Sequence, residues 1–182
     1  RSLTEKTFDK KRIEAQRSVL SRINQNLTDS ITYATRIQSA MIPTENRLRD
    51  ILPNSFVYFR PRDMVSGDFY YLYSSGNKTF LAVVDCTGHG VPGAFMSIIG
   101  MDLLKSIIEG HKEDDPGRIL ELMNTQLAET FTTNTSQLEE GDSILRDGMD
   151  MGLCVIDHEN GMMNFAGAVN ELYVIRNNEI NS

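Results

Sequence analysis

The sequence predicts an α+β fold in which antiparallel strands form a sheet and helices cover one of its faces. After residue 55, segments rich in β-branched and aromatic residues come first, two segments with helical spacing follow, and three strand-like segments come last. This order is typical of α+β domains rather than of alternating α/β domains. Turn signals between neighbouring strands, "SSGNK" and "HENG", favour antiparallel hairpins.

Composition indicates a globular domain with an extension. The 182 residues are 40% hydrophobic and 24% charged, and the net charge of -7 gives no general attraction for nucleic acid or anionic membranes. Cys86 and Cys154 stand far apart and form no CxxC pattern, which fits a reducing cytosol. No charged-then-apolar leader and no apolar run of about 18 residues is visible. We expect a cytoplasmic location, and membrane attachment through a larger sensor protein stays open because the chain begins without Met in a charged segment.

A long helix is expected at the start of the chain, because residues 1–42 contain neither proline nor glycine. Residues at alternating spacings of three and four form a heptad seam: Ile13, Gln16, Leu20, Ile23, Leu27, Ser30, Ala34, Ile37 and Met41. The polar seam positions could select the register of a parallel dimer. We therefore expect residues 1–43 to be a linker helix that forms a coiled-coil homodimer and ends at Pro43. An amphipathic helix packed on its own domain is the open alternative.

Residues 44–182 are expected to form the domain. The predicted strands are "FVYFR", "DFYYLY" and "TFLAVVD" before the helices, and "MDMGLCVID", "MMNFAGAV" and "ELYVIR" after them. One helix is predicted from near Pro92 to Gly110, and a second begins at Pro116. The polar segment "TTNTSQLEEGDSILRDG" is predicted to be a loop.

Two aspartates at strand ends are the candidate site residues. Asp85 ends an apolar strand before the glycine-rich segment "CTGHG", and Asp68 follows Gly67 at the start of another strand. A carboxylate at the edge of a core is costly unless it is paired or binds a cation. Neighbouring carboxylates and backbone carbonyls could form an all-oxygen site for Mg²⁺ or Mn²⁺. The open alternative is that Asp85 begins a turn and caps the following helix, while Asp68 is a surface turn residue.

Other candidates are weaker. Cys86 and His89 could suggest a thiol nucleophile and its base, but nothing in the sequence indicates an oriented base or an oxyanion site. We expect His89, which lies between two glycines, to fix the turn. Asp147 and Asp150 precede a strand, so we interpret them as loop residues and assign neither to a metal.

The motif "MVSGDFYYL", followed by "LAVVDCTGHGVPGAFMSIIGMDLL", resembles the bacterial SpoIIE-type branch of the metal-dependent, type 2C protein phosphatases. The segment "SITYATRIQSAMIP" resembles the linker helix that joins sensory regions to such domains, and "MNFAGAVNELYVIR" resembles a later core hairpin. The resemblance runs from about Asp29 to Arg176, and the segment around Asp85 is its most specific part.

The resemblance implies a two-sheet αββα sandwich that hydrolyses phosphoserine or phosphothreonine on a regulatory partner protein in bacterial signalling. By position, Asp85 would be shared by two Mn²⁺ or Mg²⁺ ions and the backbone carbonyl of Cys86 would bind one of them. Asp68 would be a neighbouring ligand, direct or through water, so that Asp68 and Asp85 are the expected catalytic residues. A metal-activated water would attack phosphorus. The substrate implied is a small protein such as an anti-sigma-factor antagonist.

The sequence departs from the family pattern in two places. Ser66 replaces the first glycine of a Gly-Gly-Asp motif, a mild change if the position does not need a positive φ. Family members also carry metal-binding aspartates after the last hairpin, and the chain stops at Ser182 before any of them. We therefore expect a partial sandwich, truncated at its C-terminal side, with an incomplete metal site. The alternatives are a non-catalytic dimeric signalling module with a phosphatase-like fold and a coiled-coil adaptor.

Overall fold

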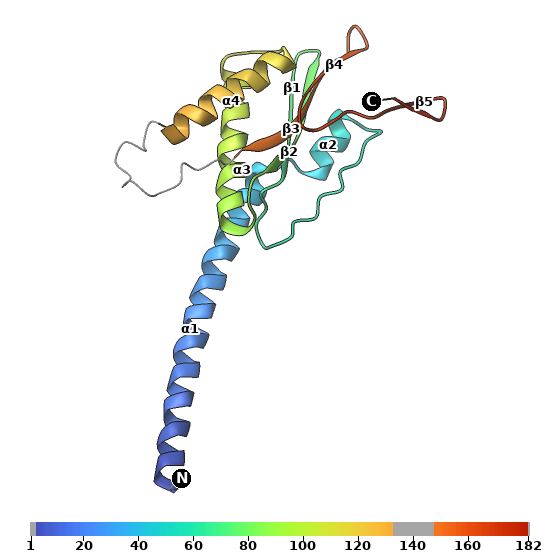
Figure 1. Cartoon of the computed structure of the whole chain (residues 1–182). Helices are drawn as coiled ribbons and strands as arrows, with labels where there is room; N and C mark the ends of the chain where they lie inside the picture. Colours follow the sequence, from blue (N-terminus) through green and yellow to red (C-terminus); the bar gives the residue numbers. More distant parts are fainter. Residues whose placement is uncertain (1–2, 133–147, 182) are drawn as a thin grey trace.

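The computed structural model describes residues 3–132 and 148–181 (Figure 1). Its helices are α1 (Leu3–Met41), α2 (Glu45–Ile51), α3 (Gly90–Lys105) with its π-helical continuation η1 (Ser106–Gly110), and α4 (Pro116–Thr132). Its strands are β1 (Phe69–Ser75), β2 (Lys78–Cys86), β3 (Met149–Asp157), β4 (Met162–Ala168), β5 (Val174–Arg176) and β6 (Glu179–Asn181). The predicted loop between α4 and β3 falls mostly on residues 133–147, which lie outside the described residues.

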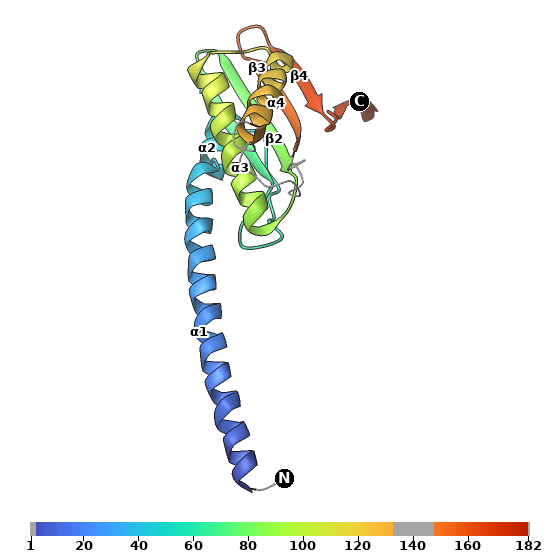
Figure 2. The same ribbon diagram turned by 60° about the vertical axis from the view of Figure 1, so that its left-hand side comes forward.

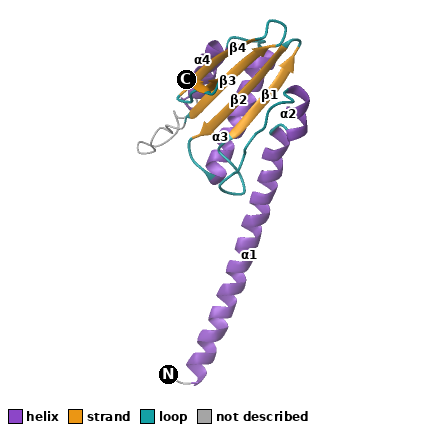
Figure 3. Cartoon of the chain, turned by 90° about the vertical axis from the view of Figure 1, so that its right-hand side faces the viewer, coloured by secondary structure: helices purple, strands orange, loops and turns teal. Residues whose placement is uncertain are grey.

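The centre of the domain is a four-stranded antiparallel sheet in the order β1-β2-β3-β4. Helices α3 and α4 lie together over one face of this sheet, and Figure 3 shows the opposite face (Figures 2 and 3). The α+β class with antiparallel strands is confirmed. The described residues supply one helical layer and one sheet of the expected sandwich. The hairpin β5-β6 is a separate two-stranded sheet, and its turn residues Asn177 and Asn178 both have positive φ.

The core lies between the sheet and its two helices. Alternate residues of β2 point into it, because Phe80, Ala82 and Val84 are at most 4% exposed. Leu104 and Ile107 on the α3–η1 helix and Ile119 on α4 are fully buried from the other side. The sequence places apolar side chains with period two on the strands and helical spacing on the helices, so the two layers bury one common core.

One helical stretch of the described residues, Gly90–Gly110, has the length and apolar composition of a membrane span, with a mean hydropathy of 1.5. Half of it is buried inside the domain. Its residues Met96, Met101 and Leu104 belong to the core cluster beneath the sheet. Packing on the sheet therefore accounts for its apolar composition.

Helix α1 extends away from the domain, and within the described residues it contacts the domain near its C-terminal end (Figure 1). Thr35 and Gln38 turn toward the domain, and Ile42, just after the helix, packs against the core. Apolar seam residues are largely exposed: Ile13 47%, Leu20 58%, Ile23 55%, Leu27 57%, Ile37 45% and Met41 40%. The last turns of α1 therefore pack on its own domain, which was one of the two alternatives for this helix. The apolar seam residues of the helix stay exposed.

Three elements differ from the sequence predictions. The segment "FVYFR" is not a strand, because it has no ladder partner among the described residues, and Phe56 and Tyr58 are 89% and 81% exposed. Of "ELYVIR", only Val174–Arg176 is a strand, paired with β6. Helix α2 was not predicted. Thr44 caps it by accepting a hydrogen bond from the Arg47 amide, 3.3 Å away.

Candidate active site

Strand register brings Asp68 and Asp85 together. Phe69 pairs with Val84, so Asp68, one residue before β1, lies opposite Asp85 near the end of β2. Val84 points into the core, and Asp85, the next residue on β2, therefore points to the face that α3 and α4 leave open. Burial raises the pKa of Asp68, and a hydrogen bond to Asp85 and the charge of that carboxylate raise it further. The two predicted carboxylates are thus close neighbours that repel each other when both are ionised.

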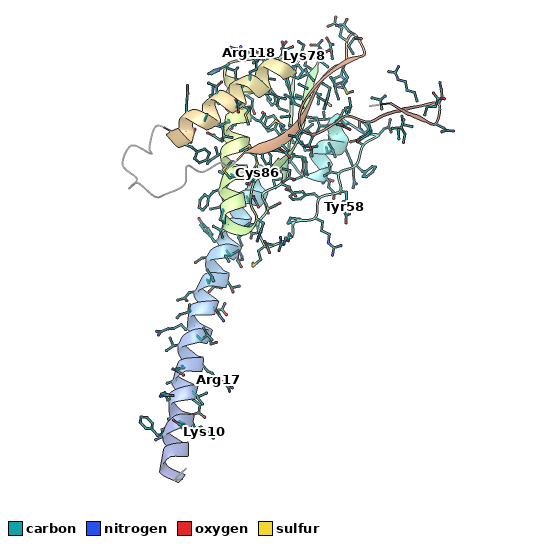
Figure 4. All side chains as sticks on the ribbon, viewed as in Figure 1. Lys10, Arg17, Tyr58, Lys78, Cys86 and Arg118 are labelled. Carbon is teal, nitrogen blue, oxygen red and sulfur yellow. The ribbon has the colours of Figure 1, made fainter. Side chains whose placement is uncertain are left out.

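Both carboxylates line a cavity of about 520 Å³ between the open face of the sheet and the segment that follows α2. Most of the other lining residues are apolar or aromatic, and one, Arg60, is positively charged. The full set is Leu48, Ser55, Phe56, Val57, Tyr58, Phe59, Arg60, Phe69, Tyr70, Leu81, Val83, Val84 and Asn170. Figure 4 shows Tyr58 on this segment and Cys86 at the end of β2. A largely apolar cavity with a few polar groups has the character of a ligand site.

Three glycines allow the two carboxylate segments to approach. A Cβ on Gly67 would lie 2.8 Å from the carbonyl oxygen of Gly88, and a Cβ on Gly93 would lie 2.7 Å from the same oxygen. Such distances are too short for any side chain, so the segment before Asp68 packs backbone to backbone against the turn after Asp85. Gly88 itself has a φ of +90°, a conformation that glycine adopts without strain.

A hydrogen bond between the side chains of His89 and Asp63 holds the turn after Asp85. His89 Nδ1 lies 3.1 Å from the Asp63 carboxylate, and His89 is also the N-cap residue of α3. The sequence prediction that His89 fixes the turn is in line with this contact. The alternative in which Asp85 caps the helix is wrong, because the cap position belongs to His89 and no side chain makes a capping hydrogen bond.

The geometry of Cys86 excludes the thiol-nucleophile interpretation. The side chain is 3% exposed and belongs to the core cluster. Burial raises the pKa of its thiol to about 12, with smaller contributions from the charges of Asp85 and Asp68, so the thiolate form is absent at neutral pH. Its backbone carbonyl oxygen is on the side of the Asp68 segment, 3.2 Å from where a Cβ on Gly67 would lie. This position is compatible with the carbonyl role that the resemblance implies.

Asp150 lies in a strand near the site, whereas the sequence analysis interprets it as a loop residue. Asp150 was assigned to a loop, but it lies on β3 directly opposite Asp85, so its side chain shares the open face of the sheet. Only the strand register could have indicated this. Within residues 3–132 and 148–181, no three His, Cys, Asp or Glu side chains are grouped closely enough to hold a metal ion. Asp68, Asp85 and the Cys86 carbonyl are oxygen donors suited to Mg²⁺ or Mn²⁺, but they form only part of a coordination shell.

The raised pKa of Asp68 predicts how the metal-free domain responds to pH. In the folded state this pKa lies above the ordinary value of 3.8, so the stabilisation from protonated Asp68 is complete below pH 3.8 and is lost as the pH rises through the folded-state pKa. We expect Asp68→Asn to stabilise the chain in EDTA at pH 7 by less than about 1 kcal/mol, since solvent screens the repulsion. Thermal unfolding should show this gain shrinking toward pH 4. An equal gain at both pH values would contradict the assigned cause.

Comparisons with known proteins bear on the family and the fold of the chain. The family model described as Stage II sporulation protein E (SpoIIE) matches residues 75–181. The structure is similar to the SiaA-PP2C domain of Pseudomonas aeruginosa, with a TM-score of 0.66 and 33% sequence identity over 82% of this chain. The chain spans 56% of the length of that structure. None of the curated proteins compared with the chain matches it.

The family match covers more than half of the chain, including the end of the first hairpin, the Asp85 turn, both core helices and the later strands. The structural match extends the similarity to most of the described residues. The chain therefore belongs to the SpoIIE family and has the α+β fold of a type 2C-like protein phosphatase domain.

Proposed function

We propose that this domain hydrolyses phosphoserine or phosphothreonine on a small regulatory partner protein and depends on Mn²⁺ or Mg²⁺. The observation that carries the proposal is the pair of strand-end carboxylates, Asp68 and Asp85, which line one cavity on the open face of the sheet. Two mutually repelling carboxylates are unfavourable alone and favourable around a cation. The anti-sigma-factor antagonists implied by the resemblance are the candidate substrate class.

The chain's own residues have distinct roles in this proposal. Asp68, Asp85 and the Cys86 carbonyl would hold the divalent cations, which when bound stabilise charge on phosphoryl oxygens and lower the pKa of the attacking water. Arg60 lines the same cavity and supplies a positive charge that attracts a phosphorylated side chain. The close backbone packing of Gly67 and Gly93 against Gly88 keeps the segments that carry Asp68 and Asp85 at a fixed separation.

Phosphate release from a phosphoserine-bearing protein, with Mn²⁺ or with EDTA, tests this function. We expect release with Mn²⁺ and none in EDTA. A phosphotyrosine protein of similar size serves as the specificity control. Release that is equal in EDTA would overturn the metal dependence, and no release with Mn²⁺ would favour the non-catalytic signalling module.

We also propose that α1 forms a parallel homodimer through its seam. The supporting observation is that Leu20, Ile23 and Leu27, spaced by three and four residues, are all more than half exposed on a helix that leaves the domain. A single helix in water gains little from such residues, whereas two seams bury them against each other. The same dimer is also expected if the chain is a non-catalytic signalling module, so the dimer proposal does not depend on phosphatase activity.

Changing the seam should therefore dissociate the dimer. We expect Leu20→Glu to convert dimer to monomer in light scattering at micromolar concentration, because two carboxylates would face each other in the seam. Ser21→Glu adds the same charge one residue away from the seam and is expected to leave the dimer intact. If both variants keep the mass of the unmodified protein, or if that protein is itself a monomer, the dimer proposal is wrong.

A further inference from the structure

The hairpin of β5 and β6 stands out from the domain on the side of the open sheet face (Figures 1 and 3). Its two strands pair with each other and, among the described residues, with no strand of the four-stranded sheet. A two-stranded hairpin on its own is only marginally stable in water and gains stability by packing on another element. The surroundings of the hairpin therefore decide whether it keeps this position.

One face of the hairpin is apolar and exposed. Ile175 and Ile180 lie directly opposite each other in the strand register and are 68% and 67% exposed. Tyr173, two residues before Ile175 and 64% exposed, continues this face. The charged residues Arg176 and Glu179 pair with each other on the other face. The hairpin thus has one face suited to burial and one suited to water.

An apolar groove of about 660 Å³ lies beside the hairpin on the open face of the sheet. Strands β2, β3 and β4 line it with Leu81, Val83, Cys154 and Phe165. The connection from β4 to the hairpin, residues 169–173, supplies most of the remaining lining. The groove and the apolar face of the hairpin are therefore two exposed apolar surfaces joined by a few residues of one chain. Packing them together would remove both from water.

The connection between β4 and β5 has the features of a hinge. Val169 has a φ of +70°, a conformation that β-branched residues rarely adopt. A Cβ on Gly167 would overlap the carbonyl oxygen of Asn170, so the chain turns sharply at this point. Residues 170–173 belong to no strand, and such short unpaired segments can absorb a change of backbone direction. The hairpin can therefore turn relative to the sheet without disturbing the pairing of β3 with β4.

We propose that the hairpin, residues 173–181, is a lid that closes onto the apolar groove of its own chain. In the closed arrangement Ile175 and Ile180 pack on the side chains of β2 and β4, while Arg176 and Glu179 face water. Because the lid, the hinge and the groove belong to one chain, closure needs no second molecule. The inference concerns the conformation of the chain and does not depend on the proposed phosphatase activity.

The closed lid also changes the candidate active site. Leu81, Val83 and Asn170 line both the groove and the cavity that holds the Asp68–Asp85 pair. A hairpin packed in the groove would therefore form one wall of that cavity. A ligand would then reach the two carboxylates only from the side away from the hairpin.

Disulfide trapping with diamide tests the lid, because Cys154 already supplies a free thiol in the groove. We expect Ile175→Cys or Ile180→Cys to form a disulfide with Cys154 within one chain, at least about tenfold faster than Glu179→Cys. Glu179→Cys is the matched control, since it lies on the polar face of the same hairpin. Replacing Cys154 by serine in the reactive variant should abolish the bond. A covalent dimer would place the hairpin on a second copy and overturn the lid, as would equal rates at all three positions.

A tryptophan reporter tests the lid without a cross-link, because the chain contains no tryptophan. We expect acrylamide to quench Ile175→Trp at least about threefold less than Arg176→Trp, since only the first position is covered when the lid closes. Adding Val83→Lys, which places a charge in the groove at a position that is 58% exposed, should raise the quenching of Ile175→Trp toward that of Arg176→Trp. Equal quenching at the two tryptophan positions, together with no disulfide to Cys154, would show that the hairpin stays open and would overturn the lid.

Discussion

Gly93→Ala is expected to destabilise the domain by about 3 kcal/mol and to abolish metal binding. The added Cβ would lie 2.7 Å from the Gly88 carbonyl oxygen and 3.1 Å from the Gly67 Cα. All these contacts are backbone atoms, which cannot rotate away as a side chain can. The first turn of α3 would have to separate from the Asp68 segment, and the two carboxylates would separate with it.

Thermal unfolding measures the first effect. A loss of about 3 kcal/mol should lower Tm by roughly 6–12 °C for a domain of this size. Gly110→Ala is the matched control at the other end of the same helical stretch, because a Cβ there would meet no atom within 4 Å. If Gly93→Ala unfolds at the same temperature as Gly110→Ala, the close packing of the three glycines is not required.

Asp85→Asn is expected to lower Mn²⁺-dependent phosphate release at least about a hundredfold, because it removes the carboxylate that the proposed site needs most. The fold should persist, since the side chain is exposed on the open face of the sheet and asparagine has the same shape. Relief of the repulsion with Asp68 should even raise Tm slightly in EDTA.

Asp102→Asn, an exposed carboxylate of α3, makes the same chemical change elsewhere and should retain full activity. The comparison separates a specific loss from a general loss of negative charge. Activity of Asp85→Asn within a few fold of Asp102→Asn would remove Asp85 from the mechanism.

Local patterns in the sequence predicted most of the domain. The hairpin of β1 and β2, both core helices and strands β3 and β4 lie where period-two or helical spacing and flanking turn residues predicted them. The segment "FVYFR" has the same alternation, with Val57 and Phe59 half-buried and their neighbours exposed. Alternation alone does not make a strand, because a ladder needs a partner that the segment's own sequence does not specify.

The site was predictable in part. Asp68 and Asp85 stood out because carboxylates at strand ends need a partner, and the family resemblance assigned them a role. Asp150 was missed because its position opposite Asp85 follows from the pairing of β2 with β3, which the sequence around it does not specify. The burial of Gln38 could not be predicted, because it depends on hydrogen bonds to Ser66 and Ser97, 28 and 59 residues away along the chain. Contacts of that separation leave no local pattern.

The most direct test of the account is a calorimetric titration of the 182-residue chain with Mn²⁺, repeated on Asp68→Asn and Asp85→Asn. The account predicts saturable binding to the unmodified chain, binding weakened at least about tenfold in either variant, and full binding in Asp102→Asn. Equal binding heats in all four proteins, or no binding to any of them, would contradict the claim that the Asp68–Asp85 pair is a divalent metal site.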